Sequence, residues 1–265
     1  MPTFLGTTAG GRAISGGVLA PRSNRGSTGS VATFFLGSLP PTVSVEYILV
    51  GGGGNAPSLV CGATAGGGGG GGTFTGSSAV IPGNTYTFSV GGAGGGTSSV
   101  SGTGWTGRTS VTGGGGGGSC NGNGGSGGSG GGGSCDGGGT CGDGGATVDS
   151  AIGANGQNGC GVNRGCSGFQ YSGYGGDSSK SFSGTTYGAR GYGQYVSSGN
   201  VQGGSGGANT GGGGTAHNGA GGSGICAIRY PETFALASAT TGSPSYALEG
   251  GYHVYRFTGT GTVTI

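Results

Sequence analysis

Short runs of alternating apolar and polar residues, separated by long glycine tracts, form the pattern of this chain. Val43–Val50 (VSVEYILV) is rich in β-branched residues, which favours a strand. In Thr85–Val90, the residues Tyr86, Phe88 and Val90 alternate with threonine and serine. This period of two predicts a strand with one buried and one solvated face.

Further strands are expected on either side of these runs. Thr73–Ile81 precedes Pro82–Asn84 (PGN), a turn signal because proline presets φ and glycine or asparagine accepts positive φ. We therefore expect a hairpin between Thr73–Ile81 and the following strand. Ile225–Glu232 and Tyr252–Phe257 predict closing strands, and helix signals are almost absent.

Glycine supplies 82 of the 265 residues. A collagen triple helix is excluded because no Gly-X-Y period is kept and only eight prolines are present. Disorder is disfavoured because charged residues are only 6% and strands interrupt the tracts. Extended rods without Cβ atoms can lie close together and exchange backbone bonds, so the tracts predict packed polyglycine-II helices, which have polyproline-II geometry.

The densest tract, Gly113–Gly145, has 21 glycines in 33 residues. As one rod it would span roughly 100 Å, so it must turn back several times. The fold class expected is all-β, with short strands, a bundle of polyglycine-II rods and almost no α-helix. The expected division is 1–45 (N-terminal arm for virion attachment), 46–112 (β-rich with glycine runs), 113–224 (glycine bundle containing the tyrosine-rich loop 163–200) and 225–265 (C-terminal strands).

Net charge and hydropathy exclude several partners. A net charge of +2 is too small for a nucleic-acid binder. No apolar stretch approaches the roughly 20 residues of a membrane helix, so no membrane insertion is expected. Residues 1–20 lack the basic and apolar regions of a secretory signal, so synthesis in a host cytoplasm is expected.

The cysteines and titratable residues give no catalytic or metal motif. Two cysteine pairs share a C-x5-C spacing that differs from zinc modules, so no metal is expected. These pairs, which are candidates for disulfides, are Cys135, Cys141, Cys160 and Cys166. Small buried thiols are the alternative interpretation. Both histidines lack a nucleophile or carboxylate at motif spacing, and no P-loop is present, so neither an enzyme nor a cofactor is expected.

Residues 163–200 differ in character from the surrounding tracts. Tyrosine offers a rigid surface with a polar tip at low entropic cost, which suits recognition, and basic residues could meet acidic sugars or phosphates. The alternative is that these tyrosines shield the ends of the glycine rods. The candidate receptor-binding residues are Trp105, Arg164, Phe169, Tyr171, Tyr174, Lys180, Phe182, Tyr187, Arg190, Tyr192 and Tyr195.

Two stretches carry a family resemblance. Val45–Gly54 (VEYILVGGGG), followed by Val80–Gly95 (VIPGNTYTFSVGGAGG), resembles glycine-rich tailed-phage tail-fibre and receptor-binding proteins. Gly221–Pro231 and Gly250–Ile265 are similar to the closing strands of those proteins, and the middle of the chain is unmatched. A looser similarity is to the tip adhesins of T-even-like long tail fibres, although their N-terminal attachment domain is not recognisable here.

The resemblance implies a non-enzymatic adhesin on a virion tail or surface. Its expected partners are a host cell-surface glycan or outer-membrane protein and, through the N-terminal arm, other virion proteins. Fibre proteins of this kind are often trimers, whereas the tip adhesins are single copies, so the resemblance is compatible with a homo-oligomer (a trimer) or with a single copy. The alternatives are a purely structural virion component (a fibre, head decoration or tail protein) and an antifreeze-like glycine-rich protein.

Overall fold

The computed structural model divides the chain into two compact units, Met1–Leu39 and Pro40–Ile265. In the first unit, β1 (Leu5–Thr7) and β2 (Ala13–Ser15) pair antiparallel. The second unit holds the other strands and the glycine tracts. Besides β1 and β2, the residues that the structure describes are 42–58, 65–120, 122–135, 141–158, 172–193, 204–216 and 218–265.

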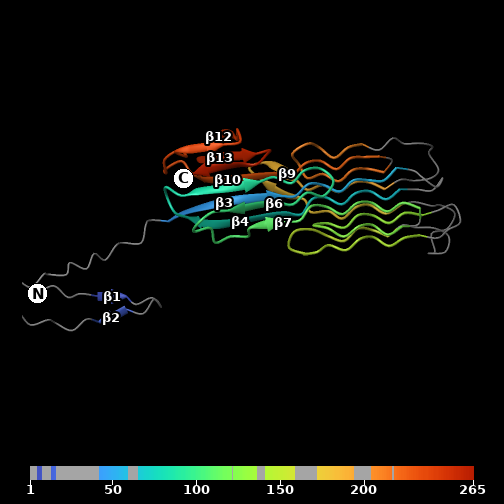
Figure 1. Cartoon of the computed structure of the whole chain (residues 1–265), viewed down its shortest axis with the longest axis horizontal. Coiled ribbons are helices and arrows are strands. Elements are labelled where there is room, and N and C mark those ends of the chain that lie inside the picture. The colour runs from blue at the N-terminus through green and yellow to red at the C-terminus, as the bar shows by residue number, and fades with distance from the viewer. Residues whose placement is uncertain are drawn as a thin grey trace, which may run out of the picture. The chain divides into compact units, whose positions relative to one another are not determined.

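The strands of the second unit form two five-stranded antiparallel sheets and one small hairpin (Figure 1). The first sheet has the order β12 (Ser245–Glu249), β13 (Tyr252–Phe257), β10 (Ile225–Pro231), β3 (Val43–Val50) and β4 (Thr73–Val80). The second has the order β11 (Ala239–Thr241), β14 (Gly261–Thr264), β5 (Thr85–Ser89), β6 (Ser98–Ser101) and β7 (Ser110–Val111). The described ranges contain no helix, which confirms the all-β prediction.

The two sheets pack face to face around an aromatic core. Tyr47 and Leu49 of β3 lie in one buried cluster with Phe88 of β5 and Phe257 of β13. The rings of Phe88 and Phe257 stack at 4.8 Å. Tyr86 is also fully buried, so the alternation predicted for this strand is confirmed. Fully burying one such side chain stabilises the fold by about 1.5–3 kcal/mol.

The prediction of a hairpin around Pro82–Asn84 is wrong, although the predicted turn is present. Gly83 has a φ of 84°, as the turn signal predicts. However, β4 pairs with β3, whereas β5 pairs with β14 and β6 of the other sheet. Tyr86 is buried between the sheets, and its hydroxyl accepts the Ile81 N–H at 2.8 Å. The turn therefore carries the chain from one sheet to the other.

The glycine tracts continue from the ends of the strands as a bundle of extended segments (Figure 1). Gly51 directly follows β3, Gly72 directly precedes β4, and Gly224 directly precedes β10. These segments are assigned neither to strands nor to helices. They bond to one another backbone to backbone, so the tract 113–135 does turn back alongside itself, with Gly131 N–H donating to Gly125 O at 2.9 Å.

Backbone bonds in the bundle follow a period of three. Successive amides of residues 66–72 donate to three neighbouring segments in turn, with N···O distances of 2.7–3.2 Å. The donor–acceptor pairs are Gly66–Gly118, Gly67–Gly173, Gly68–Gly214, Gly69–Gly115, Gly70–Gly176, Gly71–Gly211 and Gly72–Thr112. Three further segments donate back to this one, through Gly54, Gly132 and Gly191. The segment is therefore bonded to six neighbours, and every third residue meets the same one.

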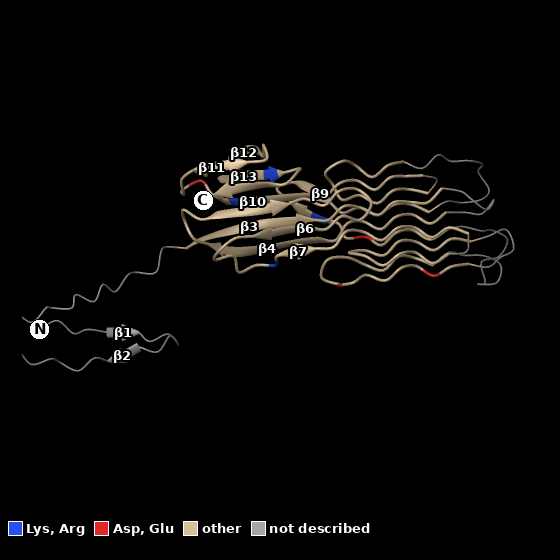
Figure 2. Ribbon diagram, in the orientation of Figure 1, with Lys and Arg blue, Asp and Glu red and all other residues tan. Residues whose placement is uncertain are grey.

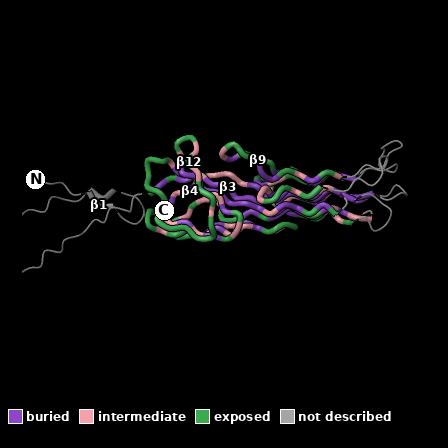
Figure 3. Tube along the Cα trace, turned by 90° about the horizontal axis from the view of Figure 1, so that it is seen from above, coloured by how far each residue is buried: buried purple, intermediate pink, exposed green. Residues whose placement is uncertain are grey.

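Close approach explains why these positions are glycine. A Cβ at Gly68 would collide with the carbonyl of Gly54, and one at Gly71 would collide with the carbonyl of Gly51. All of Gly66–Gly72 are buried, and buried segments run through the bundle in Figure 3. The hydrogen bonds thus require neighbouring backbones at a separation that excludes side chains.

Gly68→Ala should lower the free energy of unfolding by at least about 1–3 kcal/mol, because the new methyl group overlaps a neighbouring carbonyl. Chemical denaturation would measure this. The matched control is Gly116→Ala, where the nearest atom to the new Cβ is Asn55 O at 3.5 Å. That variant should be neutral or slightly more stable, by up to about 1 kcal/mol, since alanine restricts the unfolded chain. Equal losses in both variants would contradict the packing argument.

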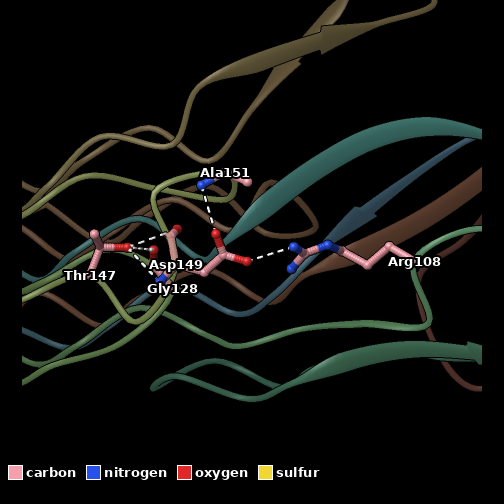
Figure 4. Close-up of polar contacts among 5 residues, drawn as sticks. All are labelled: Arg108, Gly128, Thr147, Asp149 and Ala151. Atoms are coloured by element: carbon pink, nitrogen blue, oxygen red, sulfur yellow. Dashed lines mark hydrogen bonds and ion pairs between the residues drawn. The ribbon is translucent and has the colours of Figure 1, made fainter.

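An ion pair joins the sandwich to the bundle (Figure 4). Arg108, between β6 and β7, donates from Nη2 to Asp149 Oδ2 at 2.5 Å. The other carboxylate oxygen of Asp149 accepts the Ala151 N–H at 2.8 Å, and Thr147 Oγ1 donates to Gly128 O at 2.8 Å. The Ala151 amide, followed by Arg108, lowers the pKa of Asp149.

Asp149→Asn should remove a pH-dependent part of the stability. Because folding lowers the pKa of Asp149, its carboxylate stabilises the fold above its unfolded pKa of about 3.9 and loses that contribution as pH falls through the folded pKa. Thermal unfolding at several pH values should give a higher unfolding temperature for the wild type than for the variant above about pH 5. The two unfolding temperatures should become equal in acid. A difference that persists unchanged in acid would exclude a role for the carboxylate charge.

Candidate functional site

Two neighbouring glycine segments, 172–178 and 188–193, hold the exposed tyrosines found in the described part of the bundle. The Gly175 N–H donates to Gly191 O at 3.0 Å, which aligns the two segments. Gly173, Gly175 and Gly191 are buried, whereas Tyr174 and Tyr192 are 37% and 57% exposed. The period of three therefore directs these two side chains outward while the flanking glycines stay inside.

Tyr174, Arg190 and Tyr192 form one cluster on this surface. The two tyrosine rings meet edge to face, with centroids 5.5 Å apart and an interplanar angle of 77°. The guanidinium carbon of Arg190 lies 5.1 Å from the centroid of Tyr174. The backbone carbonyls of both tyrosines accept amides from other segments, of Gln157 at 2.8 Å and of Ala216 at 2.9 Å. The backbone that carries the cluster is thus hydrogen-bonded to neighbouring segments.

The chemistry of this cluster suits a polar ligand with apolar faces. Tyrosine rings offer contact area together with hydroxyl groups, and an arginine can pair with carboxylate or phosphate. Charged side chains are sparse over the described part of the bundle (Figure 2). The cationic group of Arg190 therefore lies on a surface that is otherwise mostly glycine, serine and tyrosine.

The prediction that Phe182 and Tyr187 contact a receptor is wrong, because both side chains are buried. They lie on the hairpin of β8 (Lys180–Phe182) and β9 (Thr185–Tyr187) and are only 6% and 3% exposed. With Ile48, Val50, Ile225 and Ala227 they form a second buried cluster on the outer face of the first sheet. Lys180 stands opposite Tyr187 in this hairpin, so these three residues are separate from the Tyr174 cluster.

Trp105, another candidate from the sequence, is partly buried and packs against the core of the sandwich. Its ring meets those of Tyr47, Tyr86 and Phe88, with centroids 4.8, 5.9 and 6.1 Å away. Its indole N–H donates to Arg108 O at 3.2 Å. The isolation of this tryptophan in a glycine-rich sequence gave no signal that distinguishes packing from recognition.

The cysteines take both of the states considered from the sequence. Cys135 and Cys141 form a disulfide between two bundle segments, and Cys120 is also disulfide-bonded. Cys226 of β10 is a buried thiol, and burial raises its pKa to about 12. Cys160 and Cys166 lie outside the described residues, as do the candidate binding residues Arg164, Phe169, Tyr171 and Tyr195.

Sequence reasoning missed a polar cleft beside the hairpin. Arg229 of β10 donates to Glu46 Oε2 from Nε at 2.8 Å and from Nη2 at 2.5 Å. Its guanidinium lies between the rings of Phe182 and Tyr252, 5.0 and 4.9 Å from their centroids. The cleft has a volume of about 490 Å³. Arg229 and Glu46 are far apart in sequence, and only the pairing of β10 with β3 brings them together.

Comparisons with known proteins identified no relative of the chain. No family model, curated protein or solved structure matches the chain. Among the described residues, no cluster of side chains could hold a metal ion. Within the same residues, the structure has no helix of the length and hydropathy needed to cross a membrane.

Phe182→Ala should lower the free energy of unfolding by about 3–5 kcal/mol, because it empties part of a buried cluster. Tyr192→Ser, at an exposed position, should change it by no more than about 0.5 kcal/mol. Denaturant titration of both variants beside the wild type measures the contrast. A large loss in Tyr192→Ser would mean that the exposed tyrosines act as structural caps.

Proposed function

We propose that the glycine segments are polyglycine-II rods. The support is the rotation of amide donors through three neighbours, since polyproline-II geometry has three residues per turn and no internal hydrogen bonds. Segment 130–134 repeats the pattern: Gly130 and Gly133 donate to one neighbour, and Gly131 and Ser134 to another. Rods bonded on all sides make a stiff body rather than a flexible tether.

On this scaffold we propose a non-enzymatic phage tail or virion-surface adhesin. The observation that carries the proposal is the exposed cluster of Tyr174, Arg190 and Tyr192 on a rigidly bonded backbone. Side chains held without loss of further backbone freedom bind with a smaller entropic cost. The ligand proposed is a host cell-surface glycan or outer-membrane protein, whose acidic groups would pair with Arg190.

The remaining parts of the proposal concern the virion. Residues 1–45 would join the protein to other virion proteins, while the receptor is met by the glycine bundle. The location proposed is the tail or surface of the particle. The resemblance to glycine-rich tail-fibre proteins supports this assignment, as do the small net charge and the absence of a catalytic motif.

A purely structural virion component is the second candidate. One observation favours it: the ring of Tyr174 contacts both the ring of Tyr192 and the guanidinium of Arg190. These side chains therefore already have contact partners within the protein. In that case the cluster would stiffen the flank of the bundle and bind nothing. The two candidates differ in whether removing the cluster affects binding to cells.

The double variant Tyr174→Ser/Tyr192→Ser tests the proposal. Fluorescently labelled full-length protein would be incubated with whole cells from a panel of bacterial strains, and bound fluorescence counted by flow cytometry. We expect wild-type protein to label a subset of strains and the double variant to lose at least about 10-fold of that binding, a free-energy loss of about 1.4 kcal/mol.

Val148→Ser is the matched control, because Val148 is 58% exposed elsewhere on the bundle. It should bind as the wild type does, and all three proteins should unfold at similar denaturant concentrations. Full labelling by a correctly folded double variant would refute the site. Wild-type protein that labels no strain would favour the structural component.

A further inference from the structure

An apolar patch lies at one edge of the sandwich, away from the receptor cluster. Its members are four of the seven large apolar side chains exposed in the described part of the chain. They are Phe234, Leu236, Tyr246 and Leu248, which are 41%, 56%, 47% and 56% exposed. Contiguous exposed apolar side chains mark sites of interaction more often than scattered ones do.

Hydrogen bonds join the parts of this patch. The Tyr246 hydroxyl lies 3.0 Å from Nδ1 of His253, whose Nε2 lies 3.1 Å from Phe234 O. Tyr246 also packs on Tyr255, with centroids 5.1 Å apart. The facing sheet ends at the short strand β11, all of whose residues are exposed. The inner face of β12 is therefore left uncovered.

β12 is also the open edge of its sheet. The turn Gly250–Gly251 has φ values of 56° and 83°, which is a two-residue hairpin of type I′. Glu249 and Tyr252 are consequently a hydrogen-bonded pair, so positions 245, 247 and 249 direct their backbone groups to β13. Tyr246 and Leu248 direct theirs to the open edge, beside the apolar patch.

The other edges of the two sheets are protected. On β4 the Ala79 N–H donates to Thr106 Oγ1 at 3.2 Å and the Thr73 N–H donates to Ile152 O at 2.8 Å, so both ends of that edge are bonded to other segments. The edges of the second sheet, β7 and β11, are only two and three residues long. Short or covered edges resist pairing with another chain. β12 has neither protection, and it carries no lysine or proline.

We propose that β12 pairs antiparallel with β12 of a second copy of this chain. With Ala247 on the two-fold axis, Tyr246 of one copy would form a hydrogen-bonded pair with Leu248 of the other, which matches the outward backbone groups. Glu249 would face Ser245, so no like charges meet, and Glu249 is already paired with Arg256 at 2.7 Å and 2.9 Å. The two apolar patches would adjoin on the same face of one continuous sheet.

This arrangement is a closed dimer and not a filament. A head-to-tail contact would need β12 to meet a different surface, and the β4 edge is already bonded to other segments at both of its ends. The two-fold pairing also differs from both states that the resemblance left open, the trimer of fibre proteins and the single copy of tip adhesins. It is independent of receptor binding, because it uses the edge of the sandwich and leaves Tyr174, Arg190 and Tyr192 unused.

Size-exclusion chromatography with light scattering tests the dimer. The mass of the wild-type protein should be twice the chain mass of 24.4 kDa. The Leu248→Lys variant, which places a charge at the pairing edge, should have the mass of a single chain. Val148→Lys, at an equally exposed position, should stay dimeric. A monomeric wild type, a trimer, or a dimer that survives Leu248→Lys would overturn the proposal.

The register has its own test. Ala247→Cys would place two thiols opposite each other in a non-hydrogen-bonded pair, where Cα atoms are about 4.5 Å apart and a disulfide can form. We expect a covalent dimer on a non-reducing gel after mild oxidation. Thr240→Cys, exposed on β11, should give none. A dimeric wild type whose Ala247→Cys variant fails to cross-link would refute this register.

Discussion

The fold depends on backbone amides that bond across segments lacking Cβ atoms. Each such bond contributes only about 1 kcal/mol net, and ordering a glycine costs about as much or more. A single tract could therefore not stay extended by itself. The segment 66–72 is stable because donors and acceptors engage six neighbours at once. The strands β3, β4 and β10 hold the starting points of these segments, so the sandwich aligns the bundle.

The same constraint decides where side chains occur. Inside the bundle a methyl group collides with a carbonyl, as at Gly68 and Gly71, so chemistry is confined to outward positions. Tyr174 and Tyr192 occupy such positions, and Arg190 covers a ring of one of them. Recognition in this protein is accordingly proposed for the surface of the glycine segments, where the backbone is cross-bonded and the side chains are exposed.

The sandwich follows more familiar rules. Aromatic side chains from both sheets fill its interior, and the hairpin β8–β9 covers part of the outer face through Phe182 and Tyr187. Arg108 and Asp149 connect it to the bundle. Its other edges are short or are bonded to other segments at their ends, whereas at β12 unpaired backbone and apolar side chains coincide. This coincidence leads to the proposed dimer.

The sequence by itself determined the local states of the chain. Its β-branched residues identified β3, alternation identified β5 and β13, and the density of glycine predicted extended, closely packed segments that turn back on themselves. These features depend on neighbours in sequence or on the absence of a Cβ atom. Tertiary structure decided which strands share a sheet, so that a predicted hairpin became a crossing between sheets at Gly83. It also decided that Phe182 and Tyr187 are buried and that Trp105 packs against the core, while Tyr174 and Tyr192 are exposed, because burial depends on contacts between segments distant in the chain.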